Sequence, residues 1–587
     1  MQYTFSKVKW MNHLNDTSAT SLAWWKAATA YQIYPRSFFD SNQDGIGDIA
    51  GIITKLDYLA ELGIDLVWIC PFYQSPNDDN GYDISDYQAI HPDFGSLADV
   101  DRLISAAHER GIRIIMDLVI NHTSDEHPWF IESRQNKTNP KRDWYIWRDG
   151  SAPTPTSPTN DPNNWESIFH GSAWQYDAAT AQYYLHLFSK KQPDLNWQNP
   201  EVKQALFSMI HWWLARGIDG FRVDAISHIQ KQPNLPSLPN PNGDDYVSSF
   251  DYHMNVDGIE QHLYELRDQA FAPFDIVTVG EANGVAAQDA LTWVAEPTEN
   301  DKGGVFNMIF QFEHMKLWSE EQNGKQFDLV EFKQILTRWQ NALEGKGWNA
   351  LYLENHDQAR SINTFANPNY WYGSATALAA CYFLMKGTPF IYQGQEIGIV
   401  NHTFTALDDF NDVSAKNLII KLQQQGKTDQ QILDLLNQVS RDHSRLPMQW
   451  NSSVFGGFSE VTPWLVVNPN YTDINVEQQQ RDPYSILQFY KQLIALRKNN
   501  PSLITGRYQL LLENDINIYA YQRIESDLTW TIITNLSDHD TNVDLDITQL
   551  GELILDNQTP NNDTARSDFM TTQLAPAYAA YVFVKKQ

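Results

Sequence analysis

RGIDGFRVDA, residues 216–225, joins the end of a predicted helix to a short apolar run. The preceding segment, EVKQALFSMIHWWLARG, is amphipathic, and Gly217 marks its expected end. The apolar run 218–223 has the length of a buried strand, and Arg222 and Asp224 lie at its end on one face. Burying such a pair costs free energy. We therefore interpret Asp224 as a catalytic nucleophile that Arg222 keeps ionised, with a structural ion pair as the alternative.

Seven further apolar runs have the character of buried strands, and helix-like segments separate them. The runs are TAYQIYP, IDLVWICP, IRIIMDLVIN, FDIVTVGE, VFNMIFQF, WNALYLEN and TPFIYQGQE. One helical segment, SLADVDRLISAAHERG, has Ser96 as its expected N-cap and Gly111 as its C-cap. The eight strands are too apolar to have a solvent-exposed face. They therefore predict an α/β fold, a parallel (β/α)8 TIM barrel. A doubly wound sheet is the alternative, but no glycine-rich phosphate loop follows the first run.

Departures from the roughly 30 residues of a barrel unit locate the insertions. The third and fourth runs are much further apart, which predicts a small inserted lobe at 123–193. A second insertion is expected at about 397–480, after the eighth run. Alternating apolar residues beyond 503 predict an all-β C-terminal domain, a β-sandwich at 504–587. The catalytic barrel would comprise 22–122 and 194–503, after a polar leader at 1–21.

Composition narrows the class of partner. The 587 residues carry a net charge of −30, which argues against nucleic acid or an anionic membrane as a partner. The chain contains no stretch of about 18 apolar residues. Its cysteines, Cys70 and Cys381, lie in separate apolar runs, which indicates free thiols in a reducing compartment. We expect a cytoplasmic protein with a small-molecule substrate; whether it is a monomer or a homodimer stays open.

The ends of the predicted strands carry most of the candidate chemistry. Active residues of such barrels come from the carboxyl ends of the strands. Those ends supply Asp117, His122, Arg222, Asp224, Glu281, His356 and Asp357. Two nearby carboxylates in unlike environments are what glycosidic bond cleavage requires, one ionised and one protonated. Catalysis is therefore favoured over a structural network.

Five motifs carry a resemblance to a known family. DLVINH, GFRVDA, VGEA, ENHDQ and QPDLNW resemble the signature regions of glycoside hydrolase family 13, the α-amylase family. QPDLNW, residues 192–197, is similar to the oligo-1,6-glucosidase and α-glucosidase branch. The resemblance covers about residues 24–500 closely and the C-terminal domain loosely.

The resemblance implies catalytic roles for individual positions. Asp224 would be the nucleophile that forms a covalent glycosyl-enzyme, and Glu281 the acid/base. Asp357 would bind ring hydroxyls and stabilise the transition state. Arg222 should lower the pKa of Asp224 by Coulomb attraction. No cofactor is expected for the chemistry.

The resemblance also implies a sugar-binding pocket. His122 and His356 would donate hydrogen bonds to sugar hydroxyls, although either alone could be a satisfied strand-end residue. Tyr82 would stack on the first sugar, and Asp79 and Arg441 would pair to clamp its non-reducing end. A closed pocket of this kind implies exo action, one glucose at a time.

Ala225, directly after the nucleophile, bears on linkage. Relatives specialised for α-1,6 bonds resemble this sequence but have Val there, and many α-1,4 enzymes have Thr or Ala. We expect a retaining α-glucosidase of short malto-oligosaccharides that favours α-1,4 bonds, with some α-1,6 activity and possible transglucosylation. The alternatives are an oligo-1,6-glucosidase, a trehalose-6-phosphate hydrolase, a sucrose isomerase and an inactive sugar-binding or transporter-associated relative.

FFDSNQDGIGDI is a separate candidate site, for a metal. Its potential ligands are the side chains of Asp40, Asn42, Asp44 and Asp48 and the carbonyl of Ile46. Alternating oxygens in a glycine-containing loop suit Ca²⁺. The twelfth-position Glu of a calcium-binding helix–loop–helix is replaced by Gly51, and a turn rich in Asp and Asn is the alternative. Because related α-glucosidases bind calcium in a matching loop, the resemblance implies a structural Ca²⁺ remote from the chemistry.

Overall fold

The computed structural model describes residues 22–152, 160–318, 327–558 and 569–586. The expected leader at 1–21 lies outside these residues. Within them, no helix has both the length and the apolar character needed to span a membrane.

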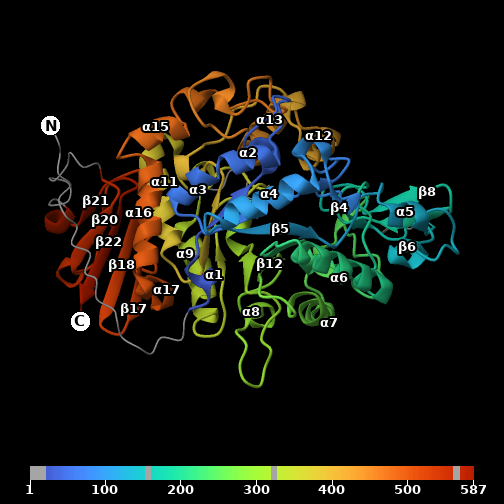
Figure 1. Ribbon diagram of the computed structural model, residues 1–587, viewed down its shortest axis with the longest axis horizontal. Helices are drawn as coiled ribbons and strands as arrows, with labels where there is room; N and C mark the ends of the chain where they lie inside the picture. The colour runs from blue at the N-terminus through green and yellow to red at the C-terminus, as the bar shows by residue number, and fades with distance from the viewer. Residues whose placement is uncertain (1–21, 153–159, 319–326, 559–568, 587) are drawn as a thin grey trace.

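Eight parallel strands form the centre of the molecule (Figure 1). Each strand pairs with a neighbour in chain order, and the last, β15, returns to pair with the first, β1. The strands are β1 (Ala30–Ile33), β2 (Leu66–Ile69), β5 (Arg113–Val119), β10 (Gly220–Asp224), β12 (Val277–Ala282), β13 (Met308–Gln311), β14 (Ala350–Leu351) and β15 (Thr388–Tyr392). The end strands β13 and β14 lie in contact and nearly close the barrel. All eight predicted runs are strands, and the predicted barrel is confirmed.

Helices surround the strands (Figure 1). They include α2 (Ile49–Thr54), α3 (Leu56–Leu62), α4 (Leu97–His108), α6 (Pro200–Ala215), α7 (Ile259–Leu266), α9 (Leu329–Ala342), α11 (Trp371–Phe383) and α16 (Ile486–Asn499). Ser96 caps α4 through a capping box with Asp99, as its position predicts. Gly111 follows this helix with a left-handed φ of 71°.

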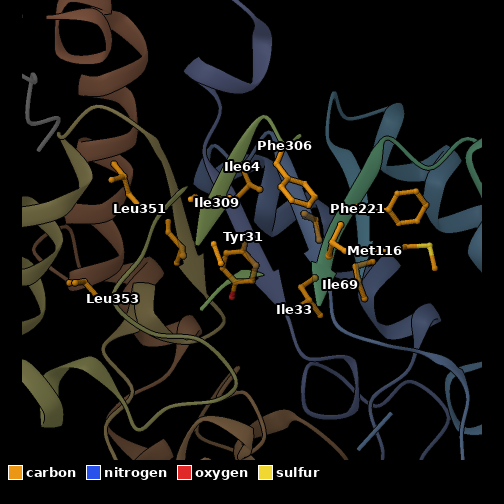
Figure 2. Packing of buried hydrophobic residues seen from close by; sticks show 14 of the residues in the cluster. Tyr31, Ile33, Ile64, Ile69, Met116, Phe221, Phe306, Ile309, Leu351 and Leu353 are labelled. Carbon is orange, nitrogen blue, oxygen red and sulfur yellow. The ribbon is translucent and has the colours of Figure 1, made fainter. Parts of the chain in front are cut away.

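The strands are buried on both faces, which explains why their sequences are apolar throughout. Tyr31, Ile33, Ile69, Met116 and Phe221 belong to one large cluster of buried side chains (Figure 2). A glycine is required where β10 begins, because a Cβ at Gly220 would lie 1.8 Å from the carbonyl oxygen of Val277 on β12. This close approach lets β10 run between β5 and β12, with Asp224 at its carboxyl end.

Two insertions and a C-terminal region are added to the barrel. A small sheet of β6 (Trp147–Arg148), β9 (Gln182–Leu185) and β8 (Trp174–Asp177), with helix α5 (Pro128–Ser133), lies within the expected lobe. Helices α12 (Val413–Gln424) and α13 (Asp429–Val439) lie within the second insertion.

The C-terminal region is an antiparallel sheet at the far end of the molecule from the lobe (Figure 1). Its five strands are β16 (Arg507–Leu511), β17 (Ile518–Glu525), β18 (Leu528–Asn535), β22 (Ala580–Lys586) and β20 (Glu552–Asp556). A two-stranded sheet of β19 (Thr541–Asn542) and β21 (Leu574–Ala575) accompanies it.

Candidate active site

The carboxyl ends of the strands surround a small pocket of about 170 Å³. Loops after the strands, the inserted lobe and the second insertion all contribute to its wall. Its lining comprises Asp79, Tyr82, His122, Ile168, Phe169, Phe188, Asp224, Ala225, His228, Glu281, Asn283, Asp357 and Arg441. The structure thus brings together all three predicted catalytic carboxylates and most of the predicted sugar-binding residues. Arg222 and His356 lie behind the wall, almost fully buried.

Five lining residues were not among the predicted ones. Ile168, Phe169 and Phe188 come from the lobe. The nearest motif of the family resemblance is QPDLNW, residues 192–197, which begins four residues after Phe188. His228 follows Ala225 by three residues in the turn after β10, and Asn283 follows Glu281 by two. Their nearness in sequence to predicted residues was the available signal.

The buried guanidinium of Arg222 joins three carboxylates. Its Nη1 donates to Asp117 Oδ1 at 2.7 Å and to Asp224 Oδ1 at 2.6 Å. Its Nη2 lies 2.8 Å from Glu281 Oε2. Asp224 and Glu281, the predicted nucleophile and acid/base, therefore approach each other across one guanidinium group.

The backbone after Asp224 turns sharply. Ala225 adopts a left-handed conformation, with φ 46° and ψ 26°, which is unfavourable for a residue other than glycine. Its N–H donates to Glu281 Oε2 at 2.7 Å. This strained turn leaves the carboxylate of Asp224 on the pocket and fixes Glu281 from the neighbouring strand.

The pKa of Asp224 departs from the sequence expectation. Burial and the charge of Glu281 raise this pKa well above its usual range, and they outweigh the attraction of Arg222. Arg222 lowers the pKa of Asp224, as predicted, but this attraction does not determine the net direction of the shift. The sequence-based prediction took into account only Arg222, two residues from Asp224. The fold also buries Asp224 and places the carboxylate of Glu281 beside it, and both raise its pKa.

Asp357 behaves in the opposite way. Burial raises its pKa, but His356, Arg441 and Arg445 together hold that pKa well below its usual range. Nη1 of Arg441 lies 3.0 Å from Asp357 Oδ1, and Nη2 of Arg445 lies 2.9 Å from the same atom. Asp357 is therefore ionised and can accept hydrogen bonds from sugar hydroxyls.

His356 and Tyr82 form a buried unit beside Asp357. Their rings are stacked with centroids 5.3 Å apart, and Tyr82 Oη lies 2.7 Å from His356 Nε2. Gln32 Nε2 is 2.8 Å from Nδ1 of His356, so Nε2 carries the proton and faces Tyr82. Burial lowers the pKa of His356 to about 3, so the ring is neutral. Direct donation from His356 to a sugar stays a prediction.

The predicted pair of Asp79 and Arg441 is present, and His122 lines the same pocket. Asp79 Oδ1 and Arg441 Nη2 form an ion pair at 3.4 Å across the pocket wall. Burial raises the pKa of Asp79 to about 7, although Arg441 and Arg445 lower it. His122 lines the pocket, and burial lowers its pKa to about 3, so it too is neutral.

The predicted calcium loop satisfies its own carboxylates. Asp40 accepts from the backbone N–H groups of Asn42, Gln43 and Gly45, and Asp48 caps α2 through the N–H of Gly51. The N–H of Ile46 donates to Asp44. In the part of the chain that the structure describes, no three acidic, His or Cys side chains are arranged to hold a metal. Calcium binding by this loop, with Asn42 and the carbonyl of Ile46 among the ligands, stays a prediction.

The barrel, with carboxylates around a pocket at its strand ends, defines a class of glycoside hydrolase. Residues 32–506 match the family described as alpha amylase, catalytic domain. The chain belongs to this family and is a glycoside hydrolase, as the motif resemblance predicts.

Individual relatives are similar over most of their length. The chain is 54% identical to a probable oligo-1,6-glucosidase 3 of Bacillus subtilis (strain 168), covering 88% of this chain and 91% of the relative. It is 46% identical to an alpha-glucosidase of Pediococcus pentosaceus, covering 86% and 89%. Among solved structures, a trehalose-6-phosphate hydrolase of Bacillus licheniformis matches with TM-score 0.86 and 39% identity, covering 96% of this chain and all of the other. An isomaltulose synthase from Klebsiella sp. LX3 matches with TM-score 0.88 and 38% identity, covering 96% and 99%.

Proposed function

We propose that the protein is a retaining, exo-acting α-glucosidase that releases glucose from the non-reducing end of short α-glucosides. The observation that carries the proposal is the placement of Asp224 and Glu281 on one guanidinium group in a small pocket. Retaining glycosidases need a nucleophile and an acid/base about 5 Å apart, whereas inverting enzymes need a wider gap to admit a water molecule. Two carboxylates bridged by one arginine favour the narrower spacing.

The chemistry would proceed in two steps. Asp224 attacks the anomeric carbon while Glu281 gives its proton to the departing glycosidic oxygen. Glu281 then removes a proton from a water molecule, which displaces Asp224 and restores the α configuration. A sugar hydroxyl in place of water would give transglucosylation.

Exo action is supported by the size of the pocket and by what adjoins it. The catalytic pocket, at about 170 Å³, suits one sugar ring, and the Asp79–Arg441 pair lies in its wall. A larger cleft of about 970 Å³ shares Phe188 with the pocket and is lined by the lobe, residues 244–248 and α12. This cleft would receive the departing part of an oligosaccharide.

Trehalose 6-phosphate suits this cleft less well than an uncharged oligosaccharide does. Lys190, Lys416 and Lys421 line it, but Lys421 is already paired with Glu166 at 3.0 Å. Asp78, Asp244 and Asp245 line the same surface, so its charge is mixed. A phosphate group would meet acidic as well as basic side chains.

The linkage preference rests on Ala225, which lines the pocket. Its small side chain leaves room on the acceptor side, which favours α-1,4 bonds with some α-1,6 cleavage. A second candidate is an oligo-1,6-glucosidase, because several relatives that are 43–54% identical carry that name. We further propose a cytoplasmic enzyme, since both cysteines are free and buried.

Replacing Ala225 by Val tests the linkage argument. The wild type should cleave maltose faster than isomaltose, and A225V should shift the ratio of kcat/KM about tenfold toward isomaltose, because added methyl groups narrow one wall. Ala60→Val, on the exposed side of α3, is the matched control and should leave the ratio unchanged. Wild-type turnover of isomaltose without maltose would contradict the α-1,4 proposal and support the second candidate.

A further inference from the structure

Asp412 belongs to the second insertion but is buried against two arginines of the active-site wall. It is the N-cap of α12, where one carboxylate oxygen, Oδ2, accepts from the N–H of Ala415 at 3.0 Å. The side chain is 1% exposed. Its other oxygen, Oδ1, faces the barrel and binds both Arg441 and Arg445, the latter at 3.2 Å.

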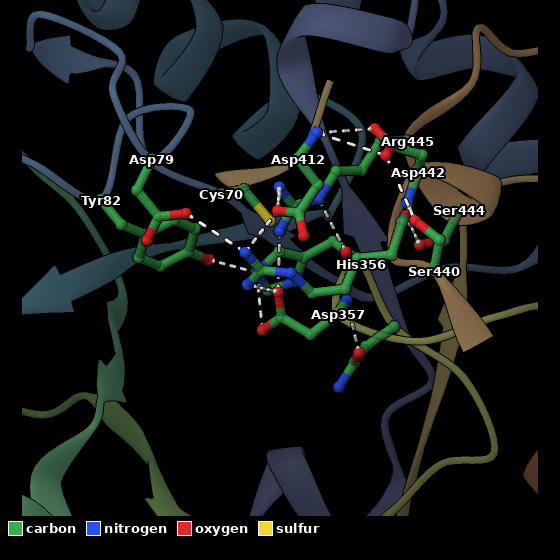
Figure 3. Close-up of polar contacts among 12 residues, drawn as sticks. Cys70, Asp79, Tyr82, His356, Asp357, Asp412, Ser440, Asp442, Ser444 and Arg445 are labelled. Atoms are coloured by element: carbon green, nitrogen blue, oxygen red, sulfur yellow. Dashed lines mark hydrogen bonds and ion pairs between the residues drawn. The ribbon is translucent and has the colours of Figure 1, made fainter. Parts of the chain in front are cut away.

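The two arginines link Asp412 to the active site. Both also bind Oδ1 of Asp357, so the four side chains form a closed ring of alternating charges. Figure 3 shows Asp412 and Asp357 with guanidinium nitrogens between them. Arg445 also donates from Nε to the carbonyl oxygen of His356 at 3.0 Å, which ties the ring to the loop that carries Asp357.

We propose that Asp412 is a positioning residue that sets the orientation of Asp357 through Arg441 and Arg445. This inference rests on the proposed function, in which Asp357 stabilises the strained sugar. A buried guanidinium deprived of one partner moves toward its remaining partners, because an uncompensated buried charge is costly. Without the charge of Asp412, both cations would shift toward Asp357 and Asp79 and displace the carboxylate that meets the sugar.

The same residue connects the catalytic centre to the larger cleft. Val413, Lys416 and Asn417, in the first turns of α12 after Asp412, line that cleft. The helix that forms one wall of the acceptor side is therefore anchored at its N-terminus on the arginines that hold Asp357. This anchoring gives the second insertion a role in the reaction.

Asp412→Asn separates charge from capping. Asn is as good an N-cap as Asp, so α12 should be retained while the charge is lost. For maltose, kcat should fall about 10- to 100-fold, in line with the cost of a misplaced catalytic group, while KM changes less than about threefold. Asp412→Glu keeps the charge and should retain kcat within about fivefold of wild type, at a lower Tm. Asp434→Asn, the same change on the exposed face of α13, is the matched control.

The outcomes separate this inference from the proposed function. A wild-type kcat in D412N, or an equal loss in D412N and D434N, would overturn the positioning role. A wild type that hydrolyses neither maltose nor isomaltose would overturn the proposed function instead. A crystal structure of D412N decides the geometry in either case: the guanidinium groups should move relative to Asp357, and unmoved groups would overturn the inference.

Discussion

Asp224→Asn should abolish hydrolysis and leave the fold intact. The amide lacks the negative charge that attacks the anomeric carbon, so kcat on maltose should fall by at least about 10³-fold, as for other catalytic nucleophiles. The side-chain carbonyl of Asn can still accept from Arg222, whose guanidinium keeps Asp117 and Glu281 as partners. The Tm should therefore stay close to the wild-type value, and calorimetry should still detect maltose binding.

Asp251→Asn provides the control for this variant. Asp251 is exposed and lies outside the pocket lining, so the same chemical change there should leave kcat unchanged. If D224N keeps more than a tenth of wild-type activity at an unchanged Tm, Asp224 is not the nucleophile.

Glu281→Gln should cause a loss that depends on the leaving group. The variant cannot protonate the departing oxygen, so kcat/KM on maltose should fall by about 10²- to 10⁴-fold, the usual contribution of general acid catalysis. A dinitrophenyl α-glucoside departs without protonation, and its kcat/KM should fall less than about tenfold. The Gln carbonyl can still accept from the N–H of Ala225, which preserves the local geometry.

Adding azide to E281Q provides a second test of the acid/base role. Azide needs no general base, so adding it should restore turnover of the aryl glucoside and yield an α-glucosyl azide. Glu260→Gln, on the exposed side of α7, should behave as wild type on both substrates. Equal losses on maltose and on the activated substrate would show that Glu281 is not the acid/base.

The fold and the catalytic carboxylates could be predicted because both follow local rules. The strands are continuous apolar runs because each is covered on both faces. Asp224 and Glu281 end two of these strands, and Asp357 follows a third in the motif ENHDQ. Parallel strands bring their carboxyl ends to one mouth, so chain position alone placed these residues together.

Other parts of the site depend on contacts that are distant in sequence. Arg445 binds Asp357 from the second insertion, and Asp412 is linked to Asp357 only through Arg441 and Arg445. No local pattern distinguishes Asp412 from a surface charge. The left-handed backbone at position 225 could not be predicted, because the residue there is Ala and not the Gly that usually marks this conformation. The pKa of Asp224 depends most on burial and then on Glu281, which comes from a neighbouring strand, so the effect of Arg222 alone did not predict the net shift.

The configuration of the first-formed product tests the central claim most directly. Proton NMR can follow the hydrolysis of p-nitrophenyl α-D-glucoside with enough enzyme to outpace mutarotation, and this substrate has no reducing end to confuse the signal. A nucleophilic Asp224 paired with Glu281 predicts that α-glucose appears first and β-glucose only later. Initial release of β-glucose would contradict the account, because it would require direct attack by water between two widely spaced carboxylates.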